Sequence, residues 1–218
     1  MIDLHTHTVY SDGELIPSEL ARRAGHAGYR GLAFTDHVDH SNVGFILSSQ
    51  LRLVHEYSIH GGIELLAGVE LTHVPPPLIA DCAAKAAEYG AQLVVVHGET
   101  VVEPVEAGTN LAAIEAGVDI LAHPGLITEQ EARLAADKGV FLEITTRKGH
   151  SLTNGHVLNL ARRTGAGLVM NNDTHGPGDL LSGEMRRRVG LGAGMTEEEL
   201  ARCFENSRGL FRDKMLRR

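Results

Sequence analysis

Histidine is the residue type whose number and spacing suggest chemistry in this chain. The 218 residues include 13 histidines. His5, His7 and Asp12 all fall in one short stretch, LHTHTVYSD. Two histidines at i and i+2 after an apolar start indicate a strand end that directs two imidazoles to one point. Imidazole and carboxylate groups serve metal coordination or acid–base catalysis, so the question is whether the rest of the chain supplies partners.

The same residue types recur at the ends of later β-rich runs. Seven such runs predict strands at 1–6, 31–36, 63–71, 92–98, 119–124, 140–146 and 167–173. Every run has a histidine or an acid in it or just beyond it. In chain order these are His5 and His7, Asp36 and His37, Glu70, His97, His123, Glu143, and Asp173 and His175.

Helix-like stretches separate the β-rich runs, at 17–28, 77–90, 109–117, 128–139 and 154–165. The sequences TEQE at 128–131 and TEEE at 196–199 predict capping boxes that open helices. The strands are apolar on both sides and about 25–30 residues apart, which is typical of parallel strands joined by helices. Seven repeats favour a distorted (β/α)7 TIM-like barrel, one domain over 1–218, rather than a doubly wound sheet. The sequence has neither a G-x-G-x-x-G motif nor a P-loop to support nucleotide binding.

The carboxyl ends of the strands form the active-site face of such a barrel. A crowd of buried histidines and acids is unfavourable there unless a cation offsets the charge, so the pattern predicts a metal centre. Imidazole and carboxylate ligands without thiolates suit Zn, Mn or Fe. About nine candidate ligands are too many for one ion, so we expect two or three divalent ions. Such centres activate water and stabilise an in-line phosphoryl displacement, whereas no G-x-S-x-G elbow supports acyl chemistry.

Composition narrows the range of partners. The net charge of −8 and the few aromatic residues (five Phe, four Tyr, no Trp) disfavour binding of long nucleic acids. The basic run MRRRVG at 185–190 is expected to be a solvated face. The two cysteines, Cys82 and Cys203, form no disulfide framework, which indicates a reducing, cytoplasmic setting. Neither a signal segment nor a membrane-spanning run is expected.

Six short motifs together resemble the polymerase-and-histidinol-phosphatase (PHP) family of metal-dependent phosphoesterases. They occur in the family's order from residue 3 to residue 175, and so span most of the chain. The motifs are DLHTHTVYSDG (3–13), TDH (35–37), GVE (68–70), VVHG (95–98), AHP (122–124) and NDTH (172–175).

The resemblance implies a distorted (β/α)7 barrel with a three-metal site. By that resemblance one ion is held by His5, His7, Glu70 and Asp173. Glu70 bridges to a second ion, which His97 and His123 complete. Asp12, His37 and His175 hold a third ion, and the family has either His or Asp at the position of Asp12.

Three further residues are candidates for catalysis, each with a plainer alternative. Asp36 would orient the metal ligands from behind, or simply cap a loop. Arg147, with Lys148 beside it, would hold phosphate oxygens, or lie in a solvated loop. His73 would protonate the leaving group, or be a loop residue, and His40 is a weaker candidate for the same role. Glu99 and Glu143 lie near the site but outside the metal set, and five histidines are expected to do no chemistry: His26, His55, His60, His150 and His156.

The leading hypothesis is a metal-dependent phosphomonoesterase similar to histidinol phosphatases, with a small phosphorylated substrate. The alternative is a phosphodiesterase or nuclease that acts on small nucleotides or RNA ends. A third hypothesis, a metal-binding domain without catalysis, is weakened because every matched ligand position is filled. The substrate, the metal in each position and the oligomeric state remain open at this level.

Overall fold

The seven β-rich runs all form parallel strands of one sheet, as predicted. The computed structural model describes residues 1–216. The sheet order is β1-β2-β4-β5-β6-β7-β8, and the short β3 continues the line of β2 and pairs with the second half of β4. The strands are β1 (Ile2–Asp3), β2 (Gly31–Phe34), β3 (His37–Val38), β4 (Glu64–Leu71), β5 (Leu93–His97), β6 (Ile120–Ala122), β7 (Phe141–Thr145) and β8 (Leu168–Asn171).

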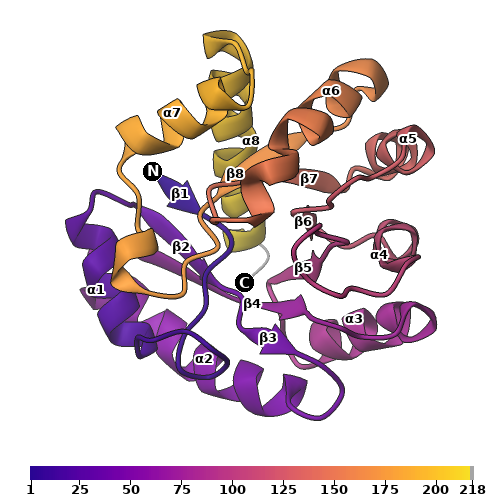
Figure 1. The fold of residues 1–218 in the computed structure, drawn as a ribbon. Coiled ribbons are helices and arrows are strands. Elements are labelled where there is room, and N and C mark those ends of the chain that lie inside the picture. The colour runs from indigo at the N-terminus through magenta and orange to yellow at the C-terminus, as the bar shows by residue number, and fades with distance from the viewer. Residues whose placement is uncertain (217–218) are drawn as a thin grey trace.

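The first and last strands approach each other and nearly close the sheet into a barrel (Figure 1). Beyond the ends of β1 and β8, Thr6 and Thr174 form a parallel bridge. The backbone N–H of His7 donates to the Thr174 carbonyl at 2.8 Å. This seam places the residues that follow β1 directly beside those that follow β8. The result is the distorted TIM-like barrel predicted from the sequence.

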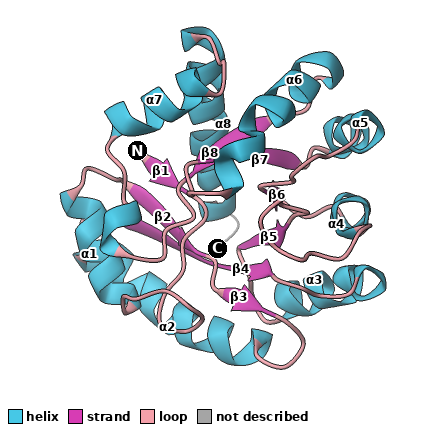
Figure 2. Cartoon of the chain, viewed as in Figure 1, coloured by secondary structure: helices cyan, strands magenta, loops and turns pink. Residues whose placement is uncertain are grey.

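Helices surround the sheet on its outer side (Figure 2). Within residues 1–216, no helix is long and apolar enough to cross a membrane. Both predicted capping boxes are present, at the starts of α5 and α8. The helices α2 and α7 were not among the predicted stretches. The helices are α1 (Pro17–His26), α2 (Val43–His60), α3 (Ile79–Glu88), α4 (Thr109–Ala116), α5 (Glu129–Lys138), α6 (Asn154–Thr164), α7 (Gly183–Gly192) and α8 (Glu197–Met215), with 3-10 turns η1 (Pro76–Leu78), η2 (His150–Thr153) and η3 (Pro177–Asp179).

Apolar side chains fill the barrel beneath the expected active-site face. Side chains two or four residues apart on a strand share a face, so Leu66 lies below Glu70 on β4 and Val95 lies below His97 on β5. Both apolar residues belong to a buried cluster that Phe211 of α8 completes. A buried apolar layer therefore supports the polar strand ends.

Arg186 contradicts the expectation that the basic run at 185–190 is a solvated face. Its side chain is only 1% exposed. The guanidinium donates to the Ile2 carbonyl at 2.8 Å and to the Met170 carbonyl, and lies 5.8 Å and 5.3 Å from the ring centroids of Tyr29 and Phe204. Arg186 thus joins β1 to β8, whereas the two arginines that follow it in α7 pair with surface glutamates.

Candidate metal centre

A pocket of about 250 Å³ opens at the carboxyl ends of the strands. This is the face on which the sequence pattern placed the chemistry. The side chains that line the pocket are those of Asp12, His37, Thr72, His73, His97, Glu103, Arg147, His150, Asp173 and His175.

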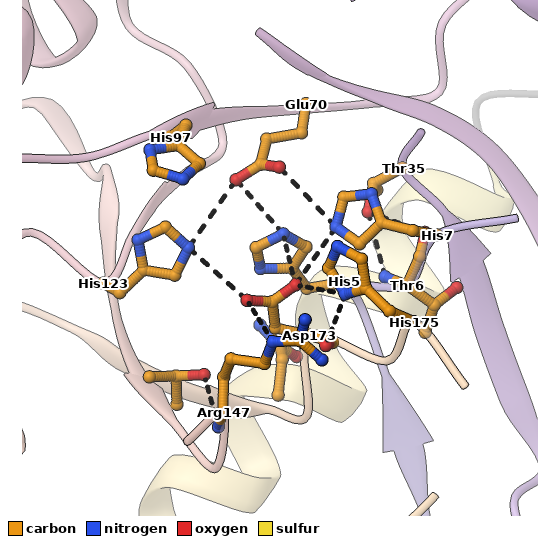
Figure 3. A network of polar contacts seen from close by, with 12 residues as sticks. His5, Thr6, His7, Thr35, Glu70, His97, His123, Arg147, Asp173 and His175 are labelled. Carbon is orange, nitrogen blue, oxygen red and sulfur yellow. Dashed lines mark hydrogen bonds and ion pairs between the residues drawn. The ribbon is translucent and has the colours of Figure 1, made fainter. Parts of the chain in front are cut away.

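Four buried side chains, one from β4 and three from the segments that follow β1 and β8, meet at the floor of the pocket (Figure 3). His5 Nε2 lies 3.2 Å from Glu70 Oε1, and His7 Nε2 lies 3.1 Å from Asp173 Oδ1. In the described chain, the two Nε2 atoms, both Glu70 oxygens and Asp173 Oδ1 are buried without a hydrogen-bond partner. Buried polar atoms are rarely left unpaired, and nitrogen and carboxylate oxygen atoms that converge in this way are a donor set that fits a divalent metal ion.

Two further groups adjoin this floor. Glu70, His97 and His123 offer ligand atoms within 4.8 Å of one another. On the outer side, Asp12 Oδ1 lies 3.3 Å from His37 Nε2 and 3.2 Å from His175 Nε2. The structure thus brings together all nine side chains predicted as metal ligands: His5, His7, Asp12, His37, Glu70, His97, His123, Asp173 and His175.

Glu143 of β7 holds two of these histidines from behind. Its Oε1 accepts hydrogen bonds from His5 Nδ1 at 2.9 Å and Asn171 Nδ2 at 2.8 Å, and its Oε2 accepts from the backbone N–H of His123 at 3.1 Å. The Nε2 atom of His5 faces the centre, and because Glu143 holds a proton on Nδ1, a neutral His5 has its lone pair on Nε2. A carboxylate behind a ligating imidazole commonly fixes the tautomer in this way.

Asp36 is buried and supports the loop between His7 and Asp12 rather than lining the pocket. Its carboxylate accepts from the Thr8 N–H at 2.6 Å, the Ser11 hydroxyl at 2.9 Å and the Gln50 amide at 2.9 Å. Asp36 therefore acts on the metal-ligand candidates only through the backbone that carries them.

Arg147 and His73 both line the pocket, as expected of substrate-contacting residues. Arg147 Nε lies 4.0 Å from Asp173 Oδ2, and its Nη1 donates to Asp179 Oδ2 at 3.0 Å. The same Asp179 oxygen accepts the backbone N–H of His175 at 3.0 Å. Asp179, which the sequence did not single out, thus connects the arginine to the loop after β8.

His150 was expected to do no chemistry, but the structure places it in the wall of the pocket. It is 7% exposed, its ring lies 4.3 Å from that of His123, and its Nδ1 is 2.9 Å from Thr100 Oγ1. Glu103, on the loop after β5, was also missed. A signal for His150 was present in its position three residues after Arg147, just beyond a strand end. His40 instead pairs with an aspartate on α3, and the remaining four histidines do not line this pocket: His26, His55, His60 and His156.

Opposite charges balance one another among the side chains of the pocket. Burial raises the pKa of Glu70, but the neighbouring His5 and His37 outweigh burial and hold that pKa well below its usual value. Burial lowers the pKa of His37, yet Glu70 and Asp12 raise it to about 10. The net effect on His5 is the same, with its pKa well above the ordinary value.

Two histidines differ from these. Burial, followed by the nearby cationic His37, lowers the pKa of His7 to about 4. Burial, followed by His97, lowers the pKa of His123 well below its usual value. Neutral imidazoles keep a lone pair free, so His7 and His123 are ready to coordinate a metal without first losing a proton.

The backbone is strained at three positions in the site. His73, His123 and Asp173 have φ angles of 52°, 26° and 55°. Such angles are uncommon outside glycine and concentrate where function fixes the geometry. Close packing accompanies the strain, because a Cβ at Gly125 (φ 61°) would lie 1.8 Å from the Glu99 carbonyl oxygen. The loops after β5 and β6 therefore cross in backbone contact.

Fold and site together define the class of protein: a parallel α/β barrel with a pocket of histidines and carboxylates at the carboxyl ends of its strands. Residues 3–100 match the PHP domain. The chain is also 50% identical over 200 residues to the uncharacterized protein MJ1295 of Methanocaldococcus jannaschii. The match covers 91% of this chain and 92% of that protein. The chain belongs to the PHP family.

Two solved structures share the fold at low sequence identity. A presumed metal-dependent phosphoesterase of Bifidobacterium adolescentis is 18% identical with a TM-score of 0.52, and the match covers 90% of this chain and 97% of that one. A zinc-bound amidohydrolase of Burkholderia ambifaria is 12% identical with a TM-score of 0.61, and the match covers 90% of this chain and 69% of that one. Both likenesses confirm the barrel fold.

Proposed function

We propose that this protein is a metal-dependent hydrolase of phosphate esters, acting on small phosphomonoesters. The observation that carries the proposal is the buried convergence of His5, His7, Glu70 and Asp173, whose inward atoms form no hydrogen bond in the described chain. The structural likeness to a presumed phosphoesterase supports the same reaction class. We expect two or three divalent ions, drawn from Zn, Mn and Fe, because the donors are nitrogen and oxygen without sulfur.

Bound metal ions would lower the pKa of water to give hydroxide near neutral pH and would polarise the phosphoryl oxygens. The remaining tasks fall to the protein's own side chains. The Arg147 guanidinium binds non-bridging phosphate oxygens, and Asp179 keeps it turned towards the pocket. His73, half-exposed at the mouth, is placed to donate a proton to the departing oxygen. Glu143 keeps the His5 ring in the tautomer that ligation requires.

The size of the pocket favours a small monoester. A volume of about 250 Å³ is below the range of about 300–1,000 Å³ that is typical of drug-sized ligands. It accommodates a phosphate and a modest leaving group more readily than both arms of a diester. The net charge of −8 also disfavours long nucleic acid as a partner. Histidinol phosphate is the first substrate to test, and a diester of small nucleotides is the alternative.

The test is phosphate release from a panel of phosphomonoesters that includes histidinol phosphate. A simple phosphodiester would be followed in parallel, with manganese or zinc added. Asp173→Asn is the inactive variant of choice because asparagine tolerates the positive φ at this position better than alanine does. Asp137→Asn, an exposed change on α5, is the matched control and should keep full activity.

Selective turnover of one monoester, lost in Asp173→Asn, would support the proposal. Turnover of the diester alone would favour the nuclease alternative. Metal binding without turnover of any ester would reject both and favour a non-catalytic metal-binding domain.

A further inference from the structure

The loop between β5 and α4 is closed at its base and carries Glu103 at its tip. At the base, Glu99 Oε1 accepts hydrogen bonds from the backbone N–H groups of Gly108 and Asn110, both at 2.9 Å. The two ends of the loop are therefore fixed together. Val101 and Val102 are about half-exposed at the tip, but the carboxylate of Glu103 lies among the residues that line the pocket.

Glu103 meets the atom of His97 that would bind metal. His97 Nδ1 lies 3.2 Å from the Gly98 carbonyl, so a neutral His97 places its proton there and its lone pair on Nε2. Glu103 Oε2 lies 3.1 Å from that Nε2. Two atoms that both carry lone pairs remain at this distance only with a proton or a cation between them.

The separation also fits two ligands of one ion. With metal–ligand bonds of about 2.0–2.2 Å, neighbouring ligands in a tetrahedral or octahedral shell are roughly 2.8–3.5 Å apart. The distance of 3.1 Å between Glu103 Oε2 and His97 Nε2 falls inside this range. A hydrogen bond from a protonated His97 has the same length, so metal binding and spectroscopy have to separate the two arrangements.

His150 holds the other oxygen of this carboxylate. Its Nε2 lies 3.3 Å from Glu103 Oε1, while its Nδ1 lies 2.9 Å from Thr100 Oγ1. The threonine hydroxyl can donate to Nδ1, which leaves the N–H of Nε2 directed at Glu103. This arrangement resembles the outer hydrogen bonds that orient metal ligands, and it gives the buried His150 a role in the site.

We infer that Glu103 is an additional ligand of a metal ion bound by Glu70, His97 and His123, oriented by His150. The inference rests on the proposed metal centre, and it adds a carboxylate from a loop to a site otherwise built from strand ends. The ion in question is a divalent transition metal, because its other donors are imidazole and carboxylate.

The test is metal affinity, measured on the full-length protein by competition with a chromogenic chelator for Zn²⁺ or Mn²⁺. Glu103→Gln keeps the shape of the side chain and removes its charge. We expect it to weaken the binding of one ion by at least about tenfold. Glu106→Gln makes the same chemical change on the same loop outside the pocket and should bind as the wild type does.

A spectroscopic reading separates ligation from a structural role. In the Co²⁺-substituted protein, the visible absorption bands report the ligands of the ion, so Glu103→Gln and Glu103→Ala should shift them while Glu106→Gln should not. Wild-type affinity together with an unchanged Co²⁺ spectrum in the Glu103 variants would overturn the inference. If the wild-type protein itself bound no metal, the proposed metal centre would fail as well, which is a distinguishable result.

Discussion

Replacing Glu143 by glutamine tests whether the metal-ligand candidates depend on the hydrogen bonds that Glu143 accepts from His5 and His123. In the wild-type protein, both oxygens of Glu143 accept: Oε1 from His5 Nδ1 and Asn171 Nδ2, and Oε2 from the His123 N–H. Asn171 cannot turn to compensate, because its Oδ1 accepts the Leu4 N–H at 3.0 Å. A glutamine fills the same volume but offers one acceptor and one NH₂ group, so it cannot satisfy all three donors.

Each orientation of the new amide has a distinct consequence. If its NH₂ faces His123, two N–H groups oppose each other in the core and one buried hydrogen bond is lost. If its NH₂ faces His5, it also opposes the NH₂ of Asn171, and the imidazole must accept at Nδ1 and keep its proton on Nε2, the atom that should bind metal. Both orientations lower the stability of the metal-free protein, and the second also lowers metal affinity.

The expected magnitude is about 1–3 kcal/mol in either case, the effect of leaving a buried donor without a partner. In the second orientation this corresponds to a loss of about 10–100-fold in metal affinity, as for other outer partners of metal-binding histidines. Urea unfolding of the metal-free protein and chelator competition for the metal measure the two effects separately.

Glu99→Gln is the matched control. Glu99 accepts both of its backbone N–H donors on a single oxygen, which a glutamine retains. Stability and metal affinity should therefore stay close to wild type in this variant. If Glu143→Gln were also within about 0.5 kcal/mol of wild type by both measurements, the tautomer argument for His5 would be wrong.

Three further outcomes are expected. Arg186→Ala should lower the free energy of unfolding in urea by at least about 3 kcal/mol, because it removes a buried cation bonded to two carbonyls. The control Arg187→Ala, at an exposed position, should change that free energy by less than about 0.5 kcal/mol. Equal losses in the two variants would contradict the burial of Arg186. In the metal-free protein, His37 has its pKa raised from 6.5 to about 10, so its stabilising contribution is complete below pH 6.5 and is lost as the pH rises to about 10. Metal must displace that proton, so calorimetry at pH 8 in two buffers of different ionisation enthalpy should show proton release on binding, and no release would refute the assignment. Arg147→Ala should raise KM for a phosphomonoester more than it lowers kcat, as should Asp179→Asn to a smaller extent; an unchanged KM would leave Arg147 without a phosphate contact.

The strand order and the side chains that meet at the strand ends could be read from the sequence because both depend on local pattern. A polar residue such as Glu70 or His97 that ends an apolar run marks the carboxyl end of a strand, and parallel strands bring those ends together. No contact had to be known to place these residues in one pocket.

The side chains that were missed depend on non-local geometry. Glu103 lies six residues beyond the end of β5, and only the closure of its loop by Glu99 turns it back into the pocket. Arg186 looks like one of three equivalent arginines, and its burial follows from carbonyl groups of β1 and β8 that are distant in the sequence. Neither a charge pattern nor a helical period distinguishes such residues.

The crossing at Gly125 has a consequence for engineering this barrel. Because a Cβ at Gly125 would overlap the Glu99 carbonyl oxygen, the loops after β5 and β6 are interlocked through their backbones. Grafting new binding loops onto the scaffold must therefore exchange these two as a unit. The loop after β7 contacts the loop after β5 through side chains instead, since His150 lies 2.9 Å from Thr100 Oγ1 and 3.3 Å from Glu103 Oε1. A library of altered substrate preference should therefore keep Arg147 and His150 and vary the other positions of that loop.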